Sequence, residues 1–309
     1  MRERSCKITK NIQITSIYSK FARQLDFYMV TIQTKKALLE QLRSLPKENH
    51  LGLVPTMGAL HQGHTSLIKK AVQENDHVVV SIFVNPTQFN NAQDLEKYPK
   101  TLDSDVALIK RIASEAIIFT PTIKEIYKND TQSKIYDFNG LDKVMEGSFR
   151  AGHFNGVGTI VEVLFNLIQP RKAYFGEKDF QQLRIIQKLT EIQKLPVEII
   201  GCPIVRETQG LAMSSRNERL HPMLRQKAGF IYQTLKTAKR KFGTENANTL
   251  KKWVETEFVA HPDFDLEYFE ITDTDTLTPI KKKTDNTKYR AFIAVFADDV
   301  RLIDNIALN

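Results

Sequence analysis

Two apolar runs joined by a turn and a helical pattern constrain the fold of this 309-residue chain more than any other feature. The first run, Leu51 to Val54, stops at Pro55, as a short buried strand would. The second run, His77 to Asn85, is long enough for a fully buried parallel strand. Between them, apolar residues recur at helical spacing over residues 67–72. The sequence therefore predicts a strand, a turn, a helix and a strand, which is a βαβ crossover.

The turn of this unit carries Gly58, Gly63 and two histidines, His61 and His64. Histidines three residues apart share one helix face at its N-terminus, where free N–H groups and the helix dipole favour an anion. Imidazoles in this place can donate hydrogen bonds to phosphate oxygens. One alternative is a zinc site, but the pair supplies only half a ligand set, with no cysteine or acidic partner beside it. The other alternative is two surface histidines near a loop.

Strands alternate with helical patterns as far as Pro203, which indicates a doubly wound parallel sheet with ligands at the carboxyl ends of its strands. After Pro203, helical patterns precede segments that alternate like hairpin strands. The predicted fold class is α/β: a Rossmann-like doubly wound parallel sheet with a smaller α+β C-terminal domain. The expected boundaries are an N-terminal extension over residues 1–28, a Rossmann-like domain over 29–204 and a C-terminal lid domain over 205–309.

Three finer expectations concern local structure. Residues 85–101 carry two prolines and many amides, which predicts an irregular loop. Asp103 is expected to cap the helix that follows. One long basic helix is expected from Pro222 to Phe242.

The net charge of +8 raises the question of a nucleic-acid partner. Residues 1–28 hold six Lys/Arg against two Asp/Glu, an excess of +4, which leaves +4 for the remaining 281 residues. So small an excess in the body argues against nucleic-acid binding. No run of 18 apolar residues exists, so no membrane span is expected. The two cysteines, Cys6 and Cys202, are far apart in sequence, which argues against a disulfide framework and favours the cytoplasm. An organelle transit peptide is the alternative to a plain extension before Met29.

Polar residues follow several of the predicted strands or precede helices. Gln88, in NPTQF after the second strand, can hold a hydroxyl or carboxylate through its amide, although loop amides more often face water. Asp105, in DLEKYPKTLDSDV, is a weak candidate for Mg²⁺, which prefers few carboxylates plus substrate phosphates. Arg150 and His153 precede a helix start, where docking of an anion and surface pairing are equally plausible interpretations.

Two segments in the second half of the chain suit a nucleotide. In GEKDFQQ, Gly176 allows close backbone approach, Lys178 offers a point charge to phosphate, and Asp179 can receive a ribose hydroxyl. MSSRN, residues 213–217, carries hydroxyls and an arginine in the polar loop between the two expected domains. Such a loop is typical of a lid that closes on a triphosphate.

The segments PTMGALHQGH, NPTQF, GEKD and MSSRN, in this order, resemble those of the pantoate–β-alanine ligase family, a branch of the His-x-Gly-His nucleotidyltransferase superfamily. The resemblance covers residues 29–309. It implies an ATP-dependent condensation of D-pantoate with β-alanine through pantoyl adenylate, which releases pyrophosphate and then AMP. It also implies Mg²⁺ and a homodimer.

The resemblance further implies roles for individual residues. His64, His61, Lys178, Ser215 and Arg216 would stabilise charge on the transferring phosphate, and the family labels the position of His64 as a proton donor. Gln88 and Gln182 would hold pantoate. ATP would lie along Met57, Gly58, Ala59, Leu60, His61, Gln62, Gly63, His64, Gly176, Glu177, Lys178, Asp179, Val205, Met213, Ser214, Ser215 and Arg216.

Two other functions fit parts of the pattern. A nucleotidyltransferase of the same superfamily would move AMP onto a phosphate acceptor, but it would need a phosphate site where this chain places amides. An RNA-binding or aminoacylation-related protein would explain the positive charge, but the charge of the body is dispersed and the C-terminal part is small.

Overall fold

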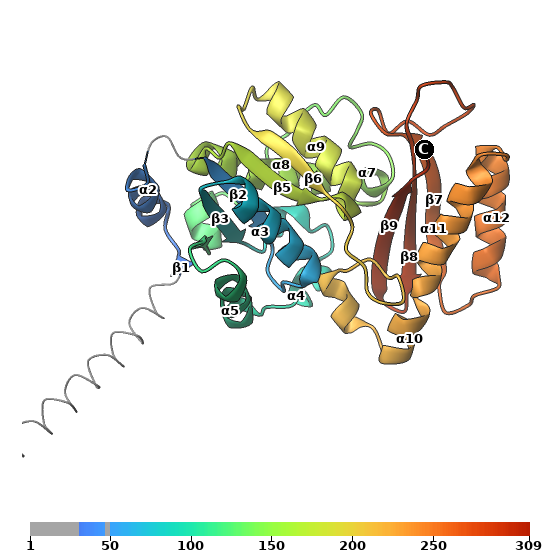
Figure 1. Cartoon of the computed structure of the whole chain (residues 1–309), viewed down its shortest axis with the longest axis horizontal. Coiled ribbons are helices and arrows are strands. Elements are labelled where there is room, and N and C mark those ends of the chain that lie inside the picture. The colour runs from blue at the N-terminus through green and yellow to red at the C-terminus, as the bar shows by residue number, and fades with distance from the viewer. Residues whose placement is uncertain (1–30, 47–49) are drawn as a thin grey trace, which may run out of the picture.

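A computed structural model describes residues 31–46 and 50–309; the expected N-terminal extension lies outside these residues. Within them the larger part of the molecule is built on a six-stranded sheet in the order β1-β4-β3-β2-β5-β6, with all paired strands parallel (Figure 1). The strands are β1 (Thr31–Ile32), β2 (Leu51–Thr56), β3 (His77–Ile82), β4 (Ile117–Phe119), β5 (Lys172–Gly176) and β6 (Glu198–Cys202). The α/β prediction is confirmed.

Alternation along the strands gives each face of this sheet its own core. Leu53, Val79 and Phe119 point to one face, where they pack with α2 (Lys35–Arg43), α8 (His153–Ile168) and α9 (Phe180–Ile192). Their neighbours Val54 and Val80 point to the other face, against α3 (Gln62–Glu74) and α5 (Leu102–Ile112). Burial on both faces explains why the strands are continuously apolar.

The strand order reverses beside β2, because β3 lies on one side of it and β5 on the other. In a doubly wound sheet this switch point opens a crevice at the carboxyl ends of the two strands. The turns that follow β2 and β5 carry the predicted residues 57–64 and 176–179, so the topology brings both segments to one place.

Helix α8 is buried along most of its length, in keeping with its nearly unbroken apolar sequence. Its Gly156 packs against the backbone of Thr87, where an added Cβ would lie 2.3 Å from the carbonyl oxygen. A larger side chain at 156 would therefore displace the short 3-10 helix η1 (Pro86–Gln88) and with it Gln88.

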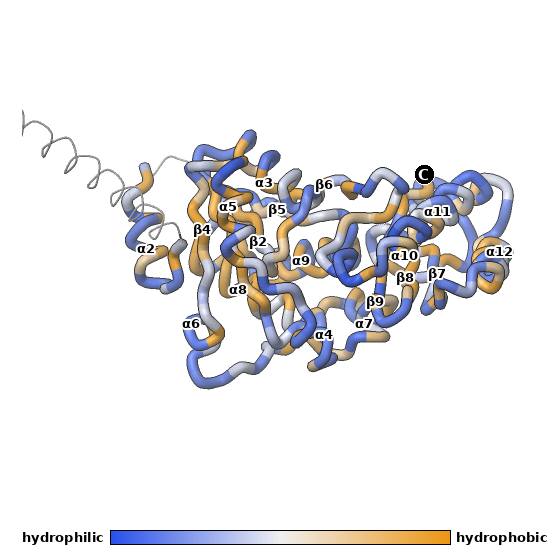
Figure 2. The backbone as a smooth tube through the Cα atoms, turned by 90° about the horizontal axis from the view of Figure 1, so that it is seen from below, coloured by the Kyte–Doolittle hydropathy of each residue, from blue (hydrophilic) through white to orange (hydrophobic). Residues whose placement is uncertain are grey.

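The C-terminal part is an antiparallel sheet in the order β7-β8-β9 that packs on helices and has its own apolar core. Its strands are β7 (Asp265–Asp273), β8 (Tyr289–Ala297) and β9 (Val300–Ala307), and its helices are α10 (Pro222–Lys227), α11 (Gly229–Phe242) and α12 (Ala247–Val259). Figure 2 shows hydrophobic stretches along β4 and α8 in the larger part, while several connecting loops are hydrophilic. No helix of the described residues is long and apolar enough to cross a membrane.

Three local expectations were wrong. The segment 85–101 is partly regular, with η1 and α4 (Ala92–Glu96), because the Asn91 side chain caps α4. Helix α5 begins two residues earlier than expected, so Asp103 lies in its first turn rather than at its cap, which is Thr101. The basic helix is divided at Ala228 into α10 and α11; a Cβ at Gly229 would lie 2.3 Å from the Gln209 carbonyl oxygen, so the chain passes closely there.

The remaining short elements are α6 (Ile123–Tyr127), α7 (Glu146–Phe149), η2 (Glu177–Asp179) and η3 (Ser215–Arg219). Of these, η2 and η3 carry predicted site residues.

Candidate active site

A cavity of about 230 Å³ opens at the switch point of the parallel sheet. Most of the residues predicted for ATP or substrate line it: Met57, His61, Gly63, His64, Gln88, Gly176, Lys178, Asp179, Gln182, Val205, Met213, Ser214, Ser215 and Arg216. Gly58, Ala59, Leu60, Gln62 and Glu177 are outside the lining, and Gln62 is exposed. Segments more than 150 residues apart in sequence thus meet in one cavity.

The two histidines cap helix α3 with their own rings. His64 Nδ1 accepts the His61 backbone N–H at 3.3 Å, and His61 Nδ1 accepts the Gly63 N–H at 3.1 Å. The ring centroids are 4.1 Å apart. Because both Nδ1 atoms accept, each neutral ring carries its proton on Nε2 and can donate it to a ligand.

Burial and neighbouring charge keep this pair neutral. Burial, followed by the positive charge of Lys178, lowers the pKa of His61 to about 4. Burial, followed by His61 and Lys178, lowers the pKa of His64 to about 3. Near neutral pH the site therefore presents two uncharged N–H donors at a helix N-terminus.

Asp105 braces the turn that leads to the histidines. Its carboxylate accepts the N–H of Ala59 at 2.9 Å and of Leu60 at 2.7 Å, and the Thr101 hydroxyl at 3.1 Å. Ala59 has a φ of 49° and Gly58 a φ of 83°, so this brace stabilises left-handed backbone. These contacts engage both carboxylate oxygens, and no cluster of three His, Cys, Asp or Glu suited to a metal exists among the described residues. The residues present do not fit a ready-made magnesium site, and a metal role for Asp105 stays a prediction.

Gln88 is buried in η1, and its amide is oriented by Asn85. Asn85 Oδ1 accepts the Tyr127 hydroxyl at 2.5 Å, so Asn85 Nδ2 faces Gln88 Oε1, 3.2 Å away. This leaves Gln88 Nε2 as a donor, 2.7 Å from Met57 Sδ in the cavity. Sequence reasoning missed Asn85 and Tyr127; Asn85 was visible as the first residue of NPTQF.

His153 and Arg150 support Gln88 from behind. His153 Nδ1 donates to the Gln88 carbonyl at 2.7 Å, and Arg150 reaches the same oxygen at 3.5 Å. Burial, followed by the charge of Arg150, lowers the pKa of His153 to about 4, so this ring is also neutral. Both residues line the cavity.

The two glutamines of GEKDFQQ have different roles. Gln181 is buried and ties neighbouring backbone: it donates to the carbonyls of Leu141 and Val144 and accepts the Glu146 N–H. Gln182 lines the cavity, where the sequence placed it. Lys178 also lines the cavity, and its ammonium lies 3.7 Å from Asp179.

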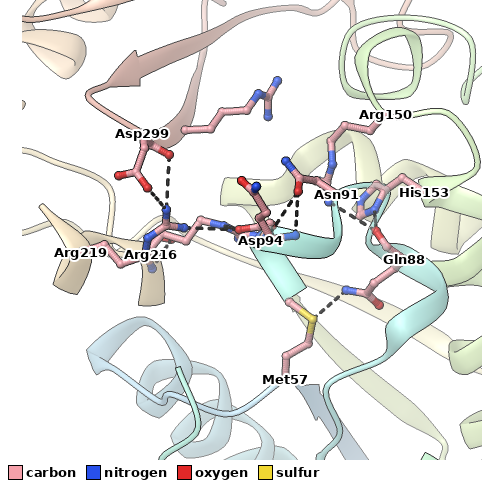
Figure 3. A network of polar contacts seen from close by, with 12 residues as sticks. Met57, Gln88, Asn91, Asp94, Arg150, His153, Arg216, Arg219 and Asp299 are labelled. Carbon is pink, nitrogen blue, oxygen red and sulfur yellow. Dashed lines mark hydrogen bonds and ion pairs between the residues drawn. The ribbon is translucent and has the colours of Figure 1, made fainter. Parts of the chain in front are cut away.

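Residues 213–216 of the MSSRN loop line the cavity, and contacts on both sides fix the loop. The Ser215 hydroxyl donates to the Ala59 carbonyl at 2.9 Å. Arg216 forms two hydrogen bonds with Asp94 of α4, at 3.2 and 2.6 Å, and Arg219 lies 3.4 Å from the same carboxylate. Figure 3 shows both arginines directed at Asp94. Burial acts to raise the pKa of Asp94, but the hydrogen bond and charge of Arg216 outweigh it and lower that pKa.

A sequence model of the pantoate–β-alanine ligase family matches residues 29–307. The chain belongs to the pantoate–β-alanine ligase family. As a member of it, the chain is a ligase that joins pantoate to β-alanine.

Relatives and solved structures of this ligase family agree along nearly the whole chain. Pantothenate synthetase of Christiangramia forsetii is 54% identical over 282 residues, covering 91% of this chain and 100% of the relative. That of Flavobacterium psychrophilum is 57% identical over 264 residues, with coverages of 85% and 94%. The crystal structure of pantothenate synthetase from Thermus thermophilus superposes with a TM-score of 0.83 at 38% identity, covering 91% of this chain and 99% of that one.

A ligand-bound ligase structure is also similar. Pantoate–β-alanine ligase from Francisella tularensis, complexed with βγ-ATP and β-alanine, has a TM-score of 0.76 at 36% identity. It covers 91% of this chain and 98% of its own.

Proposed function

We propose that this ligase works through an acyl adenylate formed in the cavity at the β2–β5 switch point. The pantoate carboxylate attacks the α-phosphorus of ATP, an oxygen–phosphorus bond forms, and pyrophosphate leaves. The neutral amine of β-alanine then attacks the acyl carbon, AMP leaves, and the amine proton passes to solvent. The observation that carries this proposal is the convergence of the histidine pair, Lys178 and the 213–216 loop on one cavity beside Gln88 and Gln182.

We assign ATP to the side of the cavity that is lined by the two histidines, Lys178 and the 213–216 loop. His61 and His64 donate Nε2–H to the α-phosphate, and the N-terminus of α3 adds its dipole. Lys178, Ser215 and Arg216 stabilise the charge that develops as pyrophosphate leaves. A neutral His64 acts here as a hydrogen-bond donor rather than as the proton donor of the family label.

Pantoate is assigned to the amides. Gln88 presents an N–H donor because Asn85 fixes its oxygen, and such a donor suits a carboxylate or hydroxyl. Gln182 approaches the same cavity from the β5 side. A pantoate analogue that lacks a hydroxyl would leave one of these amides unpaired, which gives the site its selectivity.

The closed loop suits a reactive intermediate. An acyl adenylate hydrolyses readily, and a 213–216 loop held to Ala59 by Ser215 and to Asp94 by Arg216 would help to exclude water from the cavity that it lines. We also propose that the boundary between the two domains lies near residue 204, because Val205 begins the segment that carries this loop.

Several further features extend the proposal. Mg²⁺ enters with ATP, bound mainly by phosphate oxygens, as that ion prefers. The ligase acts as a homodimer in the cytoplasm, a state that analytical ultracentrifugation of the purified protein tests. A monomer at micromolar concentration would contradict the dimer.

The reaction is tested by mass spectrometry of incubations with ATP, Mg²⁺ and D-pantoate, with and without β-alanine. Without β-alanine, enzyme-bound pantoyl adenylate and pyrophosphate should form in an amount equal to the enzyme. With β-alanine, AMP and pantothenate should accumulate together. AMP formation that ignores pantoate, or a dinucleotide made from a phosphorylated acceptor, would contradict the proposal.

A further inference from the structure

The turn that carries Lys178 is held by the C-terminal sheet. Lys178 lies in η2, at the carboxyl end of β5 in the parallel sheet. Asn305, on β9 and 127 residues away, donates its Nδ2 hydrogens to the carbonyls of Glu177 at 2.9 Å and Lys178 at 2.8 Å. Asn305 is only 1% exposed. Two adjacent carbonyls of the turn thus depend on one buried amide.

The orientation of that amide is determined by its other neighbour. Arg290 of β8 donates to Asn305 Oδ1, and arginine can only donate, so the oxygen must face Arg290 and the nitrogen must face η2. Arg290 is itself fixed, because it pairs with Glu177 at 3.2 Å and its guanidinium lies 4.0 Å from the centre of the Phe180 ring. The amide cannot rotate without breaking a bond to a buried charge.

The residue before Asn305, Asp304, contacts the segment that leads to the 213–216 loop. Asp304 is buried and forms two hydrogen bonds with Arg206, at 2.5 and 2.9 Å. Arg206 directly follows Val205 and forms a bridge with Ala212, next to the 213–216 loop. Successive residues of a strand point to opposite sides, so this dipeptide contacts both the Lys178 turn and the loop segment.

We propose that Asn305 is a positioning residue for adenylate formation, which fixes the backbone of η2 so that the Lys178 ammonium stays directed at the nucleotide. This inference rests on the proposed role of Lys178. Asn305 lies outside the cavity lining and acts through the turn alone. Displacement of a reacting group by about 1 Å can slow a reaction by roughly 10²-fold.

The test compares Asn305→Asp with the wild type in single-turnover formation of pantoyl adenylate. Aspartate keeps the shape and the oxygen that faces Arg290, but it replaces the two N–H donors by an oxygen that repels both carbonyls. Adenylate formation should slow by about 10- to 100-fold, while KM for ATP and pantoate changes by less than about threefold. Asn309→Asp is the matched control, because Asn309 Nδ2 also donates to a backbone carbonyl, that of Thr287, at an exposed place near the chain end. The control should adenylate at the wild-type rate.

A double-mutant cycle decides whether Asn305 acts through Lys178. In a Lys178→Ala background, Asn305→Asp should cause little further loss, because the group it positions is gone. Full additivity, or wild-type adenylation by folded Asn305→Asp, would overturn the inference. If Lys178→Ala alone adenylates normally, the proposed role of Lys178 fails and the inference fails with it.

Arg290→Lys provides a second variant should Asn305→Asp not fold. It keeps the positive charge and the amide but removes the planar guanidinium that orients it. Slower adenylation with unchanged KM and the same loss of effect in the Lys178→Ala background supports the proposal. Wild-type adenylation by this variant overturns it.

Discussion

The parallel sheet and the C-terminal sheet are connected in two different ways. At η2 the connection is buried: the Asn305 amide bonds two backbone carbonyls, and the Arg290 side chain is 10% exposed. At α4 the connection is ionic: Asp94 pairs with Arg216 and Arg219, and Lys97 pairs with Asp299, where the last two side chains are 54% and 59% exposed. Figure 3 shows Asp94 with Arg216 and Arg219, and Asp299 next to Arg219.

The difference teaches which contact sets geometry and which can exchange partners. Buried hydrogen bonds with fixed donors and acceptors hold one arrangement, because leaving any of them unmade costs about 1–3 kcal/mol. Ion pairs near the surface, such as Lys97 with Asp299, contribute about 0–1 kcal/mol and weaken with salt. The Arg216–Asp94 pair lies between the two cases, since its side chains are 23% and 25% exposed. We therefore expect Arg216 to share its guanidinium between Asp94 and a phosphate, whereas buried hydrogen bonds hold the turn that presents Lys178.

The largest expected effect is at Lys178, the cavity residue whose turn the buried connection holds. Lys178→Ala removes the ammonium aimed at the transferring phosphate and should slow adenylation by roughly 10²–10³-fold. Single-turnover quench experiments measure it, with the melting temperature as a check on folding. Lys97→Ala, which removes a lysine from the ionic connection, is the control and should adenylate within about fivefold of wild type. Equal losses in the two variants would erase the distinction.

Gln88 tests whether the amides in the cavity bind pantoate or only support the structure. Gln88→Leu leaves a polar group of pantoate unpaired, so KM for pantoate should rise by roughly 5- to 150-fold. KM for ATP should change little, because the proposed nucleotide contacts remain. Steady-state kinetics with each substrate varied in turn separates the two constants. A parallel rise in both would mean that the amide is structural.

The ionic connection should give a smaller effect that depends on salt. Asp94→Asn removes the charge that holds Arg216 and should raise KM for ATP by about 2- to 5-fold at low ionic strength. The difference from wild type should shrink as potassium chloride is added, since salt screens the pair. Asp299→Asn, which leaves Arg216 paired, should change KM less. A salt-independent effect would place Asp94 with the buried contacts.

The smallest effect concerns pH and the neutral histidines. The pKa values of His61 and His64 are lowered from 6.5 to about 4 and about 3, so in the window between these values and 6.5 the unfolded chain binds more protons. The stability from their neutral state is therefore present above pH 6.5 and is lost as pH falls through that window. The melting temperature should drop by several degrees from pH 7 to pH 5, and less in His64→Asn. An equal drop in that variant would contradict a neutral His64.

Local patterns were sufficient for the parallel sheet and for most of the cavity. The apolar runs predicted β2 and β3, and the polar strings after strand ends supplied His61, His64, Gln88 and Lys178 because parallel strands end at one edge. Asp105 shows where this reasoning stops: its carboxylate accepts the Thr101 hydroxyl and two backbone N–H groups 45 and 46 residues away, contacts that the sequence does not indicate, while its metal role stays a prediction.

The contacts that join the two sheets were beyond sequence reasoning for a similar cause. Asn305 pairs with carbonyls 127 and 128 residues away, and Asp94 pairs with Arg216 across 122 residues. The sequence around one residue of such a pair contains no periodicity or motif that indicates the other residue. Only the packing of the C-terminal sheet against the parallel sheet determines these pairs.

Inhibitors of this ligase would meet two kinds of donor in one cavity. The histidine rings offer hydrogens without charge, because each Nδ1 is already occupied by backbone N–H. Formal positive charge comes instead from Lys178 and Arg216, and Lys178 lies near enough to lower the pKa of both histidines. A neutral sulfonyl or carbonyl group thus suits the histidine end, whereas an acidic group belongs beside the lysine or arginine. A compound that placed its only anion at the histidines would gain hydrogen bonds and the dipole of α3 there, but no ion pair from the rings themselves.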